Sequence, residues 1–327
     1  MKKLTFLVLT AIMAFLIASC EETVSPKAEF REQYILTCIV DVSSDSVIAI
    51  LSKTYDVDGL KPEANRVDPA VTSAEITISE GPASFKFSEG ERQRTDTSRY
   101  TNRQQYYCAK GVRFVGNKDL KIVAKLPNGK VLSSVTTPPP TPEIEFSYKF
   151  PNDMVDPTVN WFIAGDYYSA SWYPVNKNHF TFPRLSIPYI KDTKSGRTSE
   201  QKEIPLYYVK QEGKLVPYYP GPNQTGYCSF EYNAMRTTFK NISEGSTEPT
   251  GYILRYIDFE LLEFDAPLST YYSSTKGVMD NFSIRAEEMV YSNISGGLGI
   301  FGSCRKTTVR KRLNPYYITS LGYKTVE

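Results

Sequence analysis

The chain has 327 residues, with 38 lysines and arginines against 36 aspartates and glutamates, one histidine and five cysteines. A nucleic-acid binder that relies on counterion release needs a strong basic surplus, so this near balance argues against nucleic acid as a partner. No two cysteines have the C-x-x-C spacing of a zinc site, and the only histidine is His179. We therefore expect no metal and no cofactor.

The N-terminal segment has the order of a bacterial lipoprotein signal. Two lysines precede an apolar run that ends at Ala18, and Cys20 occupies the acceptor position of a lipobox. This run of about 15 residues is shorter than the roughly 20 that a helix needs to span a bilayer. We expect residues 1–19 to be a signal peptide, Cys20 to be lipidated and residues 20–33 to form an anchor and tether. An ordinary cleaved signal with a chance cysteine is the alternative.

Two glutamates follow Cys20 and resemble the surface-export signal of Bacteroidota lipoproteins. Several acyl chains on one cysteine hold a protein firmly on a membrane. The expected location is the outer membrane, lipid-anchored and facing the cell surface.

Residues 34–137 have the alternating pattern of short, half-buried strands. The first runs are Tyr34 to Val42 and Ser46 to Ser52, and Asn128-Gly129 separates two later ones. Asn-Gly between two alternating runs predicts a hairpin. About six or seven short strands in a segment of this length predict an immunoglobulin-like β-sandwich.

Residues 138–142 are rich in proline and predict a semi-rigid linker to a second domain at residues 143–327. In this second domain Glu212-Gly213 lies between two strand patterns and predicts a hairpin. A long strand is expected over Tyr252–Phe264, and a short helix over Pro267–Met279. The chain should therefore be mainly all-β, a sandwich followed by a second β-rich domain with little helix.

One of the five cysteines, Cys20, is assigned to the lipid. The other four form an even set in an oxidising compartment, which predicts two disulfides among Cys38, Cys108, Cys228 and Cys304. Three pairings are open. A division into two domains favours Cys38 with Cys108 and Cys228 with Cys304.

Acidic residues in the second domain are the only candidates for hydrolytic chemistry, namely Asp258, Glu260, Glu263, Asp265, Glu287 and Glu288. Glycoside hydrolysis needs two carboxyl groups at a defined separation, and nothing in the sequence marks one acid from another. His179 has no recognisable nucleophile motif to accompany it and is expected in a surface loop. We therefore assign no catalytic residue and expect a protein that is not an enzyme.

Exposed aromatic side chains are candidates for contact with a ligand or partner. Trp161, Trp172, Tyr218 and Tyr219 could stack on a sugar or anchor a partner protein. Packing inside a β-sheet is the alternative for each of them.

The most specific motif is the run from Val290 to Gly302. Its last six residues match G-x-G-x-x-G, but only 25 residues follow them, too few for the βαβ unit that a dinucleotide site requires, so the glycines are expected to permit close packing. The residues of the motif are Tyr291, Asn293, Gly296, Gly297, Gly299, Phe301 and Gly302.

This motif resembles that of a Bacteroidota lipoprotein family, the domain of unknown function 4249. The family joins it to a lipobox, an N-terminal immunoglobulin-like part and a threonine-proline crossover, which here is Thr136 to Pro142. The resemblance implies an accessory lipoprotein found beside TonB-dependent outer-membrane transporters. It carries over no catalytic residue.

The leading hypothesis is a non-enzymatic binding or accessory component of a TonB-dependent nutrient uptake system, with a glycan or peptide as ligand. The alternative is an adhesin or fimbria-associated subunit, which would polymerise by donating a strand. A glycan hydrolase is the third hypothesis.

Overall fold

The computed structural model describes residues 29–57, 61, 64–116, 118–148, 167–193, 196–243, 249–275 and 291–325. The expected signal peptide and Cys20 lie outside these residues, as do three of the side chains singled out above, Trp161, Glu287 and Glu288. Within the described ranges, no helix has the length and hydropathy needed to cross a bilayer.

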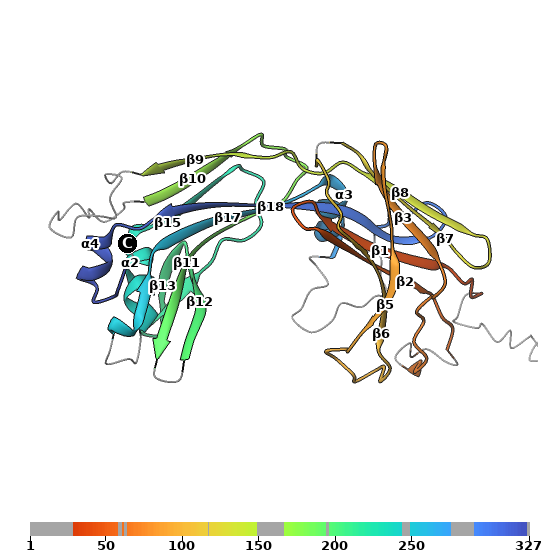
Figure 1. The fold of residues 1–327 in the computed structure, drawn as a ribbon, viewed down its shortest axis with the longest axis horizontal. Coiled ribbons are helices and arrows are strands. Elements are labelled where there is room, and N and C mark those ends of the chain that lie inside the picture. The colour runs from red at the N-terminus through yellow and green to blue at the C-terminus, as the bar shows by residue number, and fades with distance from the viewer. Residues whose placement is uncertain are drawn as a thin grey trace, which may run out of the picture.

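The first lobe is a β-sandwich (Figure 1). Its strands are β1 (Tyr34–Asp41), β2 (Ser46–Lys53), β3 (Glu75–Glu80), β4 (Ala83–Lys86), β5 (Ser88–Arg92), β6 (Gln104–Lys110), β7 (Leu120–Lys125) and β8 (Val131–Thr136). One sheet has the order β1-β2-β6-β5 and the other β4-β3-β7-β8. Alternate side chains such as Leu36, Ile76 and Ile122 are fully buried between the sheets. The predicted sandwich is confirmed.

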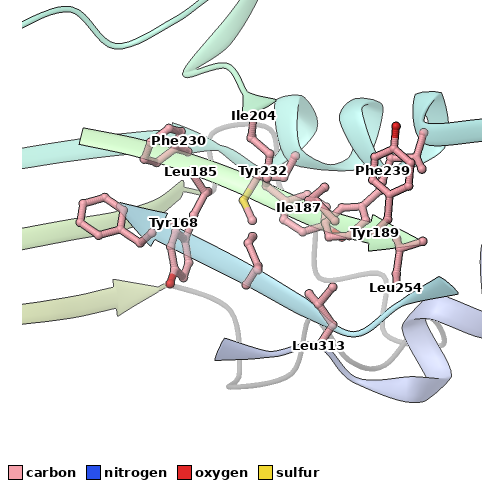
Figure 2. Packing of buried hydrophobic residues seen from close by; sticks show 14 of the residues in the cluster. Tyr168, Leu185, Ile187, Tyr189, Ile204, Phe230, Tyr232, Phe239, Leu254 and Leu313 are labelled. Atoms are coloured by element: carbon pink, nitrogen blue, oxygen red, sulfur yellow. The ribbon is translucent and has the colours of Figure 1, made fainter. Parts of the chain in front are cut away.

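The second lobe is also mostly β. Its elements are β9 (Glu143–Tyr148), β10 (Tyr167–Tyr173), β11 (Thr181–Thr193), β12 (Gly196–Ile204), β13 (Tyr207–Gln211), β14 (Lys214–Tyr218), β15 (Tyr227–Glu231), α2 (Tyr232–Lys240), η2 (Asn241–Ser243), η3 (Pro249–Gly251), β16 (Tyr252–Leu254), β17 (Tyr256–Phe264), α3 (Ala266–Thr275), β18 (Leu298–Arg312) and α4 (Pro315–Ser320). The order β12-β11-β17-β18 forms one sheet, and β15-β10-β9 forms another. The two sheets and α2 enclose a core that includes Leu185, Phe230 and Phe239 (Figure 2).

A single strand, β18, joins the sheets of the two lobes. Its first half runs parallel to β1, from Leu298 opposite Ile35 to Cys304 opposite Asp41. Its second half runs antiparallel to β17, so that one continuous sheet passes through both lobes (Figure 1). The linker at residues 138–142 therefore divides the chain but not the fold, because the last strand of the chain completes the first sandwich.

The local predictions in the second lobe agree with the structure in part. Strands β13 and β14 pair around Glu212 and Gly213, both with positive φ, as a tight hairpin requires. The expected long strand over Tyr252–Phe264 is interrupted at Arg255 into β16 and β17. Within the described residues, α3 occupies the expected helix. Helices α2 and α4 were not predicted.

Candidate functional site

The glycine motif, of which residues 291–302 are described, holds β18 against the first lobe. The side-chain amide of Asn293 acts as a strand partner for Phe301, because its Oδ1 accepts from Phe301 N (2.9 Å) and its Nδ2 donates to Phe301 O (2.7 Å). Ser295 pairs with Ser133 on β8 through two backbone hydrogen bonds. Tyr291 lies half-buried at the start of the segment. The residues before β18 are thus fixed to the opposite sheet of the sandwich.

The glycines of the motif lie in close contact with their neighbours, so that an added side chain at these positions would clash. A Cβ atom on Gly299 would lie 2.0 Å from Leu36 O, and one on Gly297 would lie 2.5 Å from Tyr34 O. Gly302 packs likewise against Leu268, where an added Cβ would lie 2.9 Å from the Leu268 Cβ. These contacts give the glycines a packing role, as expected from the sequence.

A buried carboxylate ties three segments together at the junction of the lobes. Asp265 is fully buried, and its Oδ2 accepts hydrogen bonds from Thr136 Oγ1 (2.5 Å), Ser303 N (2.5 Å) and Ser303 Oγ (2.6 Å). Its Oδ1 accepts from Leu268 N (2.8 Å) and so caps α3. Burial raises the pKa of Asp265, while these hydrogen bonds act to lower it. Both oxygens accept hydrogen bonds from the surrounding chain, which gives this residue a structural role.

Asp265→Asn is expected to lower the free energy of unfolding by about 2–3 kcal/mol, because an amide would face the Ser303 N–H and leave it buried without an acceptor. Urea unfolding measures this loss. Asp119→Asn is the matched control: Asp119 accepts from Thr137 in the same crossover but is exposed. A loss of equal size in both variants would contradict the role given to Asp265.

The two predicted disulfides are wrong, and all four cysteines are free. Cys38 faces the core from β1, whereas Cys108 lies on β6 between the core residues Tyr107 and Ala109 and so faces the other side of the sheet. Strand β2 lies between them, and strands two positions apart are separated by more than a disulfide can span. Cys228 and Cys304 belong to β15 and β18, in different sheets. Burial raises the pKa of Cys38, Cys228 and Cys304 to about 12, so these thiols are inert at neutral pH.

A cavity of about 310 Å³ lies where the second core ends beside the crossover between the lobes. On β17 the side chains of Ile257, Phe259 and Leu261 fill the core, and the next position on the same face is Glu263. The side chains that the site uses are Pro140 from the crossover, Trp172 from β10, His179, Thr181 from β11, Gln224 and Glu263.

Two polar atoms on side chains that line this cavity are buried and, within the described chain, have no hydrogen-bond partner. They are Oε2 of Glu263 and Nε1 of Trp172, on residues that are 4% and 1% exposed. Buried polar groups in native proteins are almost always paired, and each unpaired one costs about 1–3 kcal/mol. A bound ligand at this cavity can supply the missing partners when the side chains that cover these two atoms shift.

The charge state of the cavity is close to neutral. Burial raises the pKa of Glu263 to about 7, against the opposing influence of Arg305, which lies directly across from it in the β17–β18 ladder. Burial also lowers the pKa of His179, with Asp265 acting in the other direction. The Nε2 of His179 lies 3.1 Å from the side-chain nitrogen of Asn176, which can only donate, so the imidazole is neutral and accepts at Nε2.

Glu263→Gln is expected to stabilise the protein at alkaline pH. The pKa of Glu263 is raised from 4.5 to about 7, so the folded state keeps its proton over an interval in which the unfolded state has lost it, and stability falls as pH rises. The variant should match the wild type at about pH 4 and exceed it by about 2–3 kcal/mol at about pH 8, in urea unfolding at each pH.

Glu260→Gln is the control, because Glu260 lies on the other face of β17 and pairs with Lys306 at 2.6 Å. It should change stability little, without that dependence on pH. If the difference in free energy of unfolding between wild type and Glu263→Gln does not change with pH, burial does not raise the pKa of Glu263.

The other described acids named from the sequence are held by hydrogen bonds or ion pairs. Asp258 makes two hydrogen bonds to Arg310, at 2.7 and 2.6 Å. Glu260 is paired with Lys306, and both oxygens of Asp265 accept the hydrogen bonds given above. Glu263 is thus the only one of these described acids that lines the cavity.

The candidate aromatic residues separate into two places. Trp172 lines the cavity with its ring packed near Phe259, at 6.3 Å between centroids. Tyr218 stacks on Tyr207 at 4.8 Å on the β13–β14 hairpin, and it and Tyr219 are exposed. Neither tyrosine lines the cavity. His179 lies in the loop before β11, as predicted, and it is half-buried at the cavity rather than free on the surface.

From the sequence, Glu263 was one of six candidate acids with nothing to separate it from the others, and His179 was assigned to a surface loop without a role. The alternating pattern of β17 could have identified Glu263. Glu263 falls on the same face of the strand as three core residues, whereas Glu260 falls on the other face. The described residues hold no cluster of three side chains able to bind a metal ion.

Fold and site together define a two-lobed, mainly β protein, whose lobes share one strand and which has a small, nearly neutral cavity beside their junction. A family model described as Domain of unknown function (DUF4249) matches residues 21–310, and the chain belongs to this family. Neither the curated proteins nor the solved structures gave a match to the chain.

Proposed function

We propose that this chain is a lipid-anchored outer-membrane protein that binds a small ligand without transforming it, as an accessory component of a TonB-dependent nutrient uptake system. The observation that carries the proposal is the cavity with two buried polar atoms that lack partners, Glu263 Oε2 and Trp172 Nε1. Unpaired buried groups lower stability, and their place on side chains that line a cavity supports a ligand as the missing partner.

Binding fits the cavity better than hydrolysis does. Glycoside hydrolysis uses two carboxyl groups, and Glu263 has no second carboxyl beside it in the cavity lining. The anchor is supported by the lipobox at Cys20, and the association with a transporter by the family likeness of the motif around Asn293.

Gentle detergent extraction of the tagged protein from its native outer membrane, followed by mass spectrometry, tests the proposal. A TonB-dependent transporter should co-purify in near-equal amount, and Cys20→Ser should release the protein from the membrane. Recovery of the protein alone, or as self-oligomers that resist heat, would contradict the proposal and favour an adhesin.

A further inference from the structure

Three properties of the cavity restrict its ligand. It must supply an acceptor for the indole N–H of Trp172 and a partner for the Glu263 carboxyl, because both groups are buried without one in the described chain. It must fit a space of about 310 Å³, which is at the small end of ligand sites. It must also tolerate surroundings with little net charge.

A hydroxyl group meets the first requirement, because it both donates and accepts. An ammonium group could donate to Glu263 but would leave the Trp172 N–H unpaired. A carboxylate could accept from Trp172 but would face the acidic Glu263. A ligand with several hydroxyl groups satisfies both protein groups without either conflict.

The charges around the cavity favour a neutral ligand. Arg305 lies opposite Glu263 in the β-ladder and already opposes its negative charge. The imidazole of His179 is neutral, and Lys177 is an exposed cation at the rim. A ligand ion would therefore lose its hydration without gaining a full counter-charge.

The rest of the lining combines apolar and polar residues. Pro140, Pro174 and Val175 present carbon surfaces, and Thr181 and Gln224 add neutral polar groups. A sugar ring has a face of C–H groups and a rim of hydroxyls, which matches this division between apolar and polar walls.

We infer that this cavity binds a neutral sugar, one ring or the terminal ring of a short glycan, whose hydroxyl groups pair with Glu263 and Trp172. The inference rests on the proposed function that the chain is a binding protein, and it specifies the class of ligand.

Isothermal titration calorimetry of the full mature chain tests the inference. The neutral probes are glucose, galactose, mannose, xylose, N-acetylglucosamine and disaccharides of these. Glucosamine and glucuronate are the charged counterparts. At least one neutral sugar should bind, and its ammonium or carboxylate counterpart should bind about tenfold more weakly or not at all.

Variants locate the binding in the cavity. Glu263→Leu and Trp172→Phe each remove one hydrogen-bonding group and should weaken binding of that sugar about tenfold or more. Glu260→Gln, on the opposite face of the same strand, should leave the affinity unchanged. Thermal unfolding of each variant confirms that it is folded, and Glu263→Gln serves as the milder second variant, because an amide keeps the shape and a hydrogen-bonding group.

Three results would overturn the inference: no binding of any neutral sugar, binding of the charged counterparts only, or binding that Glu263→Leu and Trp172→Phe leave intact. None of these would remove the proposed function if a transporter co-purifies, because the cavity would then serve another ligand. Absence of the transporter, with sugar binding intact, would remove the uptake role and keep the ligand class.

Discussion

A fragment that ends at Thr137 is expected to remain unfolded, although it contains every strand between β1 and β8. The missing strand is the first half of β18, which pairs with β1 over seven residues. Phe301 and Ile294 also belong to the core of the first lobe, at 0% and 6% exposed. Without these two side chains the fragment loses about 3–6 kcal/mol of stabilisation from apolar burial. The free energy of unfolding of a whole domain is only about 5–15 kcal/mol.

Circular dichroism and hydrogen exchange of residues 29–137 measure this outcome. The matched control is the same fragment with residues 291–305 joined after Thr137 by a flexible glycine-serine linker, which should fold cooperatively. Cooperative folding of the shorter fragment, with equal stability, would show that β18 is not part of the first lobe's folding unit.

Gly299→Ala is expected to destabilise the protein by about 4 kcal/mol or more, so we expect a low yield of the purified variant. The new Cβ would lie 2.0 Å from Leu36 O, so β1 and β18 must separate, and φ at this position is +124°. Overpacking and backbone strain each cost about 1–3 kcal/mol. Urea unfolding of the purified variant measures the loss.

Gly111→Ala separates the two causes. Gly111 also has a positive φ, +68°, but an added Cβ would meet no atom within 4 Å. This variant should lose only about 1–2 kcal/mol, the cost of the left-handed conformation. Similar losses at both positions would mean that the close approach of β18 to β1 is not what the motif requires.

Local patterns predicted the strands of the first lobe well, because runs such as Leu120 to Leu126 have apolar residues at every second position. The hairpin at Glu212-Gly213 followed from turn chemistry in the same way. The pairing of β1 with β18 joins segments more than 250 residues apart in sequence, and no local pattern specifies it. The glycine motif indicated close packing at this part of the chain, but it did not indicate that the partner is β1.

The site was less predictable than the fold. Trp172 was named as an aromatic candidate, but its burial depends on two sheets meeting around it. The disulfide prediction failed because it used only the even number of cysteines. It did not consider which face of the sheet each cysteine side chain occupies. Tyr107 and Ala109 point inward, so Cys108 between them must point outward, away from the side that Cys38 faces.

The α2 helix shows a further limit of local reading. Tyr232, Met235 and Phe239 are buried at helical spacing, yet the helix is short and lies among strands rich in tyrosine. Its packing against the second core, rather than the preference of its own residues, selects the helix (Figure 2).

Fluorine NMR of Trp172 tests the central claim, that the cavity beside the junction is the binding site. The protein is labelled with 5-fluorotryptophan in a Trp161→Phe background, so that Trp172 gives the only indole signal. We predict that a neutral sugar shifts this signal saturably, with the midpoint found by calorimetry, and that Glu263→Leu abolishes the shift while Glu260→Gln preserves it. An unchanged signal in the presence of bound sugar would place the binding site elsewhere and contradict the account.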